Sequence, residues 1–149
     1  MNVRLASLPD DSQAVLAGAK DFISRMDFTE GLPDSDEELL GSIYYLASVG
    51  LEIAVAEEGG EIVGGIGILY APFPWNRSKI VASEMFIWAK RGAPPLTFRA
   101  LMRFVSNRML ERKVVLREFV ALTSSPSGLG RIYEKMGLRK VQETYMGAV

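Results

Sequence analysis

The chain has 149 residues, of which 48% are hydrophobic and 9% aromatic, so it predicts one folded domain over residues 1–149 and excludes intrinsic disorder. It contains no cysteine and no histidine, which excludes disulfides, thiolate chemistry and the commonest general base, and no metal site is expected.

The net charge of -1 conceals an uneven distribution along the chain. Residues 1–62 hold 3 basic and 13 acidic side chains, whereas residues 77–117 hold 10 basic and 2 acidic ones. A basic block of this kind indicates a local anionic partner or a solvated helix face. Nucleic-acid binding is disfavoured, because the chain as a whole is acidic and we expect no exposed aromatic residues interleaved in the block. No stretch of 18 uncharged apolar residues occurs, so we expect no membrane contact and a cytoplasmic protein.

The first third of the chain predicts one short strand and two helices. The strand is expected over residues 3–6. The first helix should follow Pro9, because the next apolar residues recur on one face of a 3.6-residue period. These residues are Val15, Ala19, Phe22, Ile23 and Met26. Ser35 and Glu38 match a capping box, so a second helix should begin there and end near Gly50.

The middle of the chain predicts a hairpin, a loop and a further strand. Residues 51–56 and 61–70 alternate as strands do, and Gly59-Gly60 between them is a tight-turn pair. Gly64, Gly65 and Gly67 mark a bulge, or a place where another backbone or a ligand comes close. Residues 71–76 contain two prolines and are expected to form a rigid loop, and residues 80–88 form the next strand.

The last third predicts alternating helices and strands. Helices are expected over residues 96–113 and 127–136, with strands over 114–122 and 138–146 and Gly137 directly after the second helix. The whole order is β-α-α-β-β-β-α-β-α-β. It predicts an α/β class of fold, a mixed sheet with helices on both faces.

Glu84 is the first candidate for chemistry, because it interrupts an apolar strand. A half-buried carboxyl group loses hydration, which raises its pKa toward the range of a general base. The alternative is that Glu84 lies on the solvent face of an alternating strand.

Two further motifs stand at the ends of helices. Arg91-Gly92 precedes the long helix, and Tyr133-Glu134-Lys135-Met136-Gly137-Leu138 closes the last one. With the order of the elements, these motifs resemble those of the Gcn5-related N-acetyltransferases. The resemblance implies a mostly antiparallel mixed sheet, acetyl-CoA as cosubstrate and acetyl transfer to an amine. It implies Glu84 as the base and Tyr133 as the acid that protonates the departing thiolate.

The resemblance also implies where the cofactor binds. The family's Arg-Gly-x-Gly-x-Gly loop appears here with Pro94 and Leu96 in place of glycines, and with Pro95 between them. Proline lacks an amide hydrogen, so the loop binds coenzyme A weakly, binds it in a shifted geometry or has lost it. The expected cofactor-binding residues are Phe86, Ile87, Trp88, Arg91, Gly92, Ala93, Leu96, Thr97 and Ser124.

The acceptor is expected to be an amine of a small molecule or a peptide. Phe73, Trp75 and Asn76 lie where the family often recognises its acceptor, and they either line a substrate pocket or serve packing. As an alternative, the fold is kept without catalysis, as a ligand-binding or protein-interaction module. Edge pairing of the final strand would make a homodimer.

Overall fold

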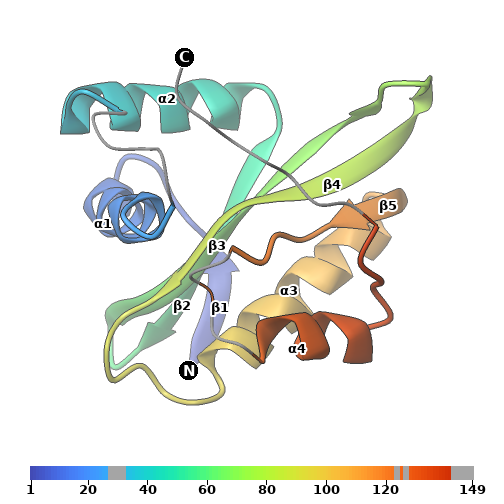
Figure 1. The fold of residues 1–149 in the computed structure, drawn as a ribbon. Coiled ribbons are helices and arrows are strands. Elements are labelled where there is room, and N and C mark those ends of the chain that lie inside the picture. Colours follow the sequence, from blue (N-terminus) through green and yellow to red (C-terminus); the bar gives the residue numbers. More distant parts are fainter. Residues whose placement is uncertain (27–32, 123–124, 126–127, 142–149) are drawn as a thin grey trace.

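The computed structural model describes residues 1–26, 33–122, 125 and 128–141. Its centre is one five-stranded sheet in the order β1-β2-β3-β4-β5 (Figure 1). The strands are β1 (Asn2–Leu5), β2 (Leu51–Glu58), β3 (Glu61–Phe73), β4 (Asn76–Ala89) and β5 (Val114–Glu118). Neighbours pair antiparallel except β4 and β5, which are parallel. The mixed, mostly antiparallel sheet is therefore confirmed.

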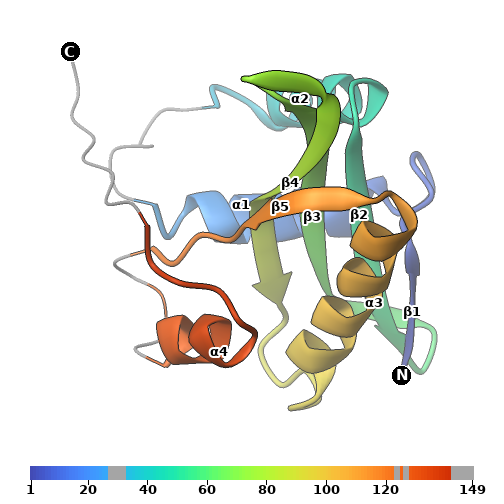
Figure 2. The ribbon, with the colours of Figure 1, turned by 90° about the vertical axis from the view of Figure 1, so that its right-hand side faces the viewer.

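Helices cover both faces of this sheet, as predicted. α1 (Ser12–Ile23) and α2 (Asp36–Ser48) lie on one face, and α3 (Thr97–Glu111) and α4 (Leu129–Lys135) lie on the other (Figures 1 and 2). The predicted cap of α2 is present, because the Ser35 hydroxyl accepts a hydrogen bond from the Glu38 amide at 3.1 Å. The Glu38 carboxylate in turn accepts one from the Asp34 amide at 2.9 Å.

The hairpin of β2 and β3 is as expected. β3 and β4 form a second hairpin whose strands are longer than the predicted strands over residues 61–70 and 80–88. Glu58 pairs with Glu61 across Gly59 and Gly60, whose φ angles of 60° and 82° suit a two-residue turn. The predicted loop over residues 71–76 is wrong for most of its length. β3 continues to Phe73 and β4 begins at Asn76. Pairing along the two strands overrides the two prolines, which stand near the hairpin end.

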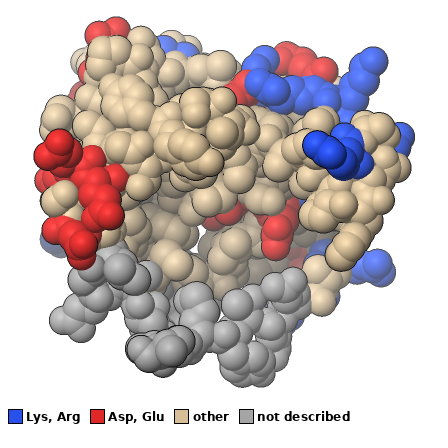
Figure 3. All heavy atoms as spheres, turned by 90° about the horizontal axis from the view of Figure 1, so that it is seen from above, with Lys and Arg blue, Asp and Glu red and all other residues tan. Residues whose placement is uncertain are grey.

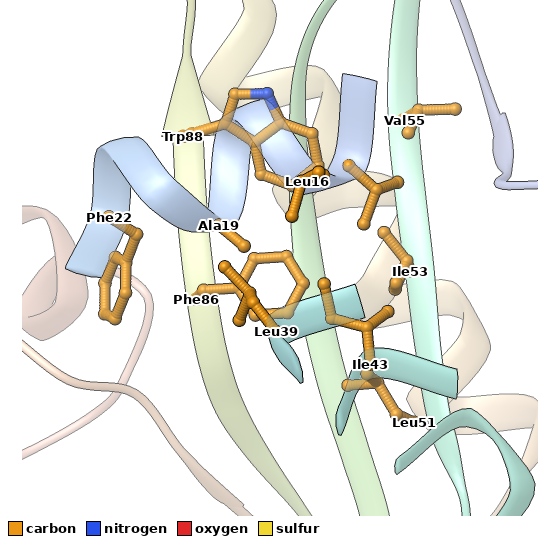
Figure 4. Packing of buried hydrophobic residues seen from close by; sticks show 11 residues of the cluster. Leu16, Ala19, Phe22, Leu39, Ile43, Leu51, Ile53, Val55, Phe86 and Trp88 are labelled. Atoms are coloured by element: carbon orange, nitrogen blue, oxygen red, sulfur yellow. The ribbon is translucent and has the colours of Figure 1, made fainter. Parts of the chain in front are cut away.

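Two hydrophobic cores lie on opposite faces of the sheet. The core beneath α1 and α2 includes Phe86 and Trp88, whose rings stack with centroids 5.7 Å apart (Figure 4). Gly65 and Gly67 of β3 pair with these two residues. A Cβ added at Gly65 would lie 2.1 Å from the Trp88 ring, so at Gly65 and Gly67 aromatic side chains come close, and not the backbone or ligand that was predicted.

A bulge in β4 decides which face each side chain takes. Gly67 pairs with Phe86 and Ile68 with Glu84, so Met85 is an extra residue on β4. Before the bulge, Ala82 packs in the core beneath α3, and after it Phe86 packs in the core beneath α1. Because strand side chains alternate with a period of two, the extra residue reverses the faces. Glu84 therefore shares the α3 and α4 face with Ala82.

The last third of the chain departs from prediction at its ends. β5 stops at Glu118 instead of residue 122, because the chain then leaves β4. Residues 138–141 are not in a strand, and the rest of the predicted strand over 138–146 lies outside the described residues. None of the helices that the structure describes is long and apolar enough to cross a membrane.

Part of the basic block is neutralised by the acidic first segment. Arg108 pairs with Glu52 at 2.8 Å and with Glu111 at 2.6 Å, and Arg112 also contacts Glu52. Seen from above, acidic side chains gather toward the start of α2 and basic ones toward the β3–β4 hairpin (Figure 3).

Candidate active site

The site begins where β4 and β5 part. The two strands pair from Ile80–Val114 to Ser83–Glu118, and the described part of the following chain adds no further pair. On its other edge, β4 stays paired with β3 as far as Ala89. Residues 85–89 of β4 therefore present an edge whose backbone hydrogen-bonding groups face an opening.

A cavity of about 210 Å³ lies in this opening. Its walls are mostly apolar and come from α1, the end of β4, α3, the chain after β5 and the start of α4. The lining residues are Phe22, Arg25, Ile87, Trp88, Ala89, Phe98, Leu101, Val120, Leu122, Ser125 and Leu129. Of the expected residues 86–88, Ile87 and Trp88 line the cavity, whereas the Phe86 side chain packs in the core beneath α1.

Glu84 lies at the point where the strands part, one residue beyond the last β4–β5 pair. It is only 5% exposed. The Tyr133 hydroxyl donates a hydrogen bond to its Oε2 at 3.1 Å. Its Oε1 is buried and has no hydrogen-bond partner among the residues that the structure describes. A buried polar atom without a partner is unusual in a folded protein, so this oxygen is free to accept a proton or a ligand donor.

Burial sets the protonation of both groups. Loss of hydration raises the pKa of Glu84 to about 7, and the Tyr133 hydroxyl and the Val120 backbone oppose this shift only in part. Burial, with the nearby Glu84 carboxylate, raises the pKa of Tyr133 well above its ordinary value. At neutral pH the carboxyl group is thus poised between its two forms while the phenol keeps its proton.

The end of α4 holds Tyr133 in place. Gly137 has a φ of 81°, which lets the Leu138 amide reach the Tyr133 carbonyl at 3.0 Å and the Gly137 amide reach Glu134 at 2.9 Å. Arg117 of β5 donates to the Met136 carbonyl at 2.5 Å. The spacing from tyrosine to glycine therefore fixes the helix end that carries the hydroxyl group.

The ring of Tyr133 has its own neighbour. The Phe119 ring lies with its centroid 5.5 Å away at a tilt of 44°, an arrangement that aromatic pairs favour. The phenol is therefore oriented from its backbone, its ring and its hydroxyl together.

The loop before α3 offers fewer free amides than its length suggests. Gly92 has a φ of 84°. The Ala93 amide donates to the Lys90 carbonyl at 3.0 Å, and the Thr97 amide donates to the Pro94 carbonyl at 2.9 Å. Thr97 is 2% exposed, and its hydroxyl also donates to Pro94, at 2.7 Å. Within the described chain, the amides of Gly92 and Leu96 have no acceptor.

The three aromatic and polar residues expected to meet the acceptor lie elsewhere. Phe73, Trp75 and Asn76 are at the tip of the β3–β4 hairpin, where Trp75 is 87% exposed. Asn76 stands eight positions before Glu84 on β4, which corresponds to about 26 Å of strand at roughly 3.3 Å per residue. The structure does not bring them to the Glu84–Tyr133 pair. Ser124 lies outside the described residues.

Several lining residues were missed by the sequence analysis. Val120 and Leu122 were expected to lie in a strand, and Phe98 and Leu101 were expected only as a core stripe. Ser125, next to the expected Ser124, also lines the cavity. Phe22 of α1 gave no signal of its own, because its spacing is that of any core residue.

Comparison with known proteins finds the same fold in solved structures. A ribosomal-protein-alanine N-acetyltransferase from Brucella melitensis biovar Abortus 2308 is 15% identical, with a TM-score of 0.73 and 100% of both chains covered. A predicted acetyltransferase with acetyl-CoA from Clostridium acetobutylicum is 21% identical, with a TM-score of 0.75, covering 99% of this chain and 95% of that one.

A transcriptional regulator from Bacillus halodurans C-125 is also similar, at 20% identity and a TM-score of 0.76, with 99% of each chain covered. No protein-family model and no curated protein matches the sequence. The chain thus has the fold of the Gcn5-related N-acetyltransferases, as the resemblance implied.

Proposed function

We propose that this protein is an acetyl-CoA-dependent N-acetyltransferase that acts on an amine of a small molecule or a peptide. The observation that carries the proposal is the buried Glu84–Tyr133 pair at the point where β4 and β5 part. The shared fold and the acetyltransferases among the similar structures support it. We expect the enzyme to work in the cytoplasm and without a metal.

The described residues fit the cofactor in most respects. Acetyl-CoA supplies an acyl group activated as a thioester. The unpaired edge of β4 and the apolar cavity beside Ile87 and Trp88 would hold its pantetheine arm. Arg91, Gly92 and Leu96, which precede the N-terminal end of α3, would hold its diphosphate.

Glu84 would accept the proton of the acceptor amine at Oε1, the oxygen without a partner. A carboxyl group with a pKa of about 7 is ionised in about half the molecules at neutral pH, which suits a base that must later release its proton. Burial also strengthens its interaction with an incoming cation, because little water screens it.

Tyr133 would supply the proton that the leaving sulfur needs. Its hydroxyl keeps a proton at neutral pH and lies beside the Glu84 carboxylate. As the nitrogen–carbon bond forms and the carbon–sulfur bond breaks, one proton leaves the amine and one arrives at the thiolate. The chain has no cysteine or histidine, so direct attack by the amine is favoured over a covalent enzyme intermediate.

The test is a calorimetric titration of the purified protein with acetyl-CoA, beside ATP as a phosphate ligand without a pantetheine arm. We expect micromolar binding of acetyl-CoA and much weaker binding of ATP. Transfer of labelled acetyl groups to a panel of amines then identifies the acceptor, with Glu84→Gln as the blank. Absence of acetyl-CoA binding at millimolar concentration refutes the proposal.

A further inference from the structure

We propose that the donor site selects the pantetheine arm and not the nucleotide, so that pantetheine thioesters lacking adenosine are accepted as donors. This inference rests on the proposed function and specifies the donor class of the same site. It is carried by a contrast between two parts of that site: the opening beside β4 and the loop before α3.

The opening beside β4 is built for an amide-containing chain. One edge of residues 85–89 has no ladder partner among the described residues, so its backbone groups remain to be satisfied. An extended ligand with amides pairs with such an edge as an added strand would. The opposite wall, with Val120, Leu122 and Leu129, is apolar and suits methylene groups.

The loop before α3 is a poor diphosphate cradle. A phosphate at a helix N-terminus is bound by amides that lack partners. Here Pro94 and Pro95 have no amide hydrogen, and the amides of Ala93 and Thr97 already donate to carbonyls inside the loop. Of residues 92–97, only Gly92 and Leu96 keep an amide without an acceptor among the described residues. The Pro94 carbonyl takes both the amide and the hydroxyl of Thr97.

This loop is also held fixed, so it does not open at low cost. The Thr97 side chain is buried against Gly64, where an added Cβ would lie 3.0 Å from its Cγ2. Releasing the Thr97 amide toward a phosphate would break bonds to Pro94 and disturb that packing. The energetic gain from an added phosphate contact is correspondingly small.

The charged side chains near the loop also contribute little to binding a phosphate group. The Lys90 ammonium pairs with Glu61 at 2.6 Å, so its charge is compensated within the protein. Arg91 is exposed, and an exposed cation contributes little to binding because water and salt screen it. Affinity for the donor is therefore carried mainly by the opening beside β4.

Calorimetric titration of the whole protein with three ligands tests this division. Coenzyme A has both halves, pantetheine has only the arm, and adenosine 3′,5′-diphosphate has only the nucleotide. We expect pantetheine to bind within about tenfold of coenzyme A, a difference of about 1.4 kcal/mol. We expect adenosine 3′,5′-diphosphate not to bind at the same concentrations.

A variant sharpens the test by returning amides to the loop. The double substitution Pro94→Gly with Pro95→Gly should raise the affinity for coenzyme A at least about fivefold, because new charge-assisted hydrogen bonds become available. The affinity for pantetheine should stay the same. Pro74→Gly, in the β3–β4 turn, is the matched control. The ratio of the two affinities within each variant is insensitive to a loss of folded protein.

The outcomes separate this inference from the function on which it rests. Coenzyme A binding more than about a hundredfold tighter than pantetheine overturns the inference and leaves the acetyltransferase proposal intact. If adenosine 3′,5′-diphosphate binds and pantetheine does not, the inference is likewise overturned and the acetyltransferase proposal is left intact. Failure of both coenzyme A and pantetheine to bind overturns the acetyltransferase proposal itself. Acetyl transfer from acetyl-pantetheine at a rate close to that from acetyl-CoA completes the support.

Discussion

The two halves of β4 have similar apolar compositions but different surroundings. Residues 80–83 are paired on both edges, with β3 on one side and β5 on the other. Among the residues that the structure describes, residues 85–89 are paired with β3 alone. The difference arises because β5 ends at Glu118. The length of β5, and not the sequence of β4, therefore decides which residues of β4 are paired on both edges. A strand becomes a candidate binding surface when its partner stops.

Each half is also fixed by a different core. The first half contributes Ala82 to the core beneath α3, and the second contributes Phe86 and Trp88 to the core beneath α1. The bulge at Met85 moves the following side chains to the other face of the sheet, and Glu84 is the residue directly before this bulge. The second half is therefore held by its pairing with β3 and by the packing of its aromatic rings beneath α1.

The largest effect is expected where the two halves meet. Glu84→Gln keeps the size of the side chain but removes the proton acceptor, so turnover should fall by roughly a hundredfold to ten-thousandfold. Steady-state kinetics with the identified acceptor measure it. Glu134→Gln, an exposed neighbour of Tyr133, is the control and should retain full activity. Equal activity of the two variants would remove Glu84 from the mechanism.

The same junction should make stability depend on pH. Burial raises the pKa of Glu84 from 4.5 to about 7, so between these values the folded chain holds a proton that the unfolded chain has released. The neutral Glu84 carboxyl therefore contributes its full stabilisation below pH 4.5. This contribution falls as the pH rises and is lost as the pH passes through about 7, where Glu84 ionises in the folded chain.

The expected loss is about 3 kcal/mol relative to Glu84→Gln, which cannot ionise. Urea unfolding of both proteins across that pH range measures it. A constant difference in the free energy of unfolding between the two proteins would show that Glu84 ionises without cost.

The second half of β4 should be sensitive to its packing on β3. Gly65→Ala places a methyl group 2.1 Å from the Trp88 ring, so we expect a loss of roughly 1–3 kcal/mol in unfolding free energy. Gly41→Ala is the matched control, because nothing lies within 4 Å of its added Cβ in α2. That control should gain up to about 1 kcal/mol from helix propensity. Similar stabilities of the two variants would contradict the packing account.

The smallest effect is expected at the other member of the pair. Tyr133→Phe removes one hydroxyl, and we expect about a tenfold fall in turnover with little change in affinity for acetyl-CoA, since water can deliver the proton. Its bond lowers the pKa of Glu84, so the rising limb of the pH–rate profile should move to higher pH. Tyr45→Phe, on the exposed face of α2, is the control. An unchanged profile would assign Tyr133 no part in the reaction.

Local signals predicted most of the elements, and their limits are physical. The capping box of α2 and the Gly59-Gly60 turn depend on contacts between near neighbours in sequence, and both are present. The bulge at Met85 and the end of β5 at Glu118 depend on pairing between distant segments, which apolar strand sequences do not specify.

The candidate site shows the same division. Glu84 stood out because a carboxyl is costly in an apolar strand, and Tyr133 because its motif resembles the one that ends the last helix in the Gcn5-related N-acetyltransferases. Their mutual contact spans 49 residues and had no sequence signal. The three residues at the β3–β4 hairpin tip were expected near the acceptor from the family resemblance, and strand pairing carries them away from the Glu84–Tyr133 pair.

The free edge of β4 has a consequence for how such proteins diverge. A surface that recognises a ligand through main-chain groups survives almost any substitution, since mutation changes side chains and leaves peptide bonds in place. Chains that share only 15–21% of their residues with this one have the same fold, so a binding edge made of main-chain groups can be present where the side chains differ.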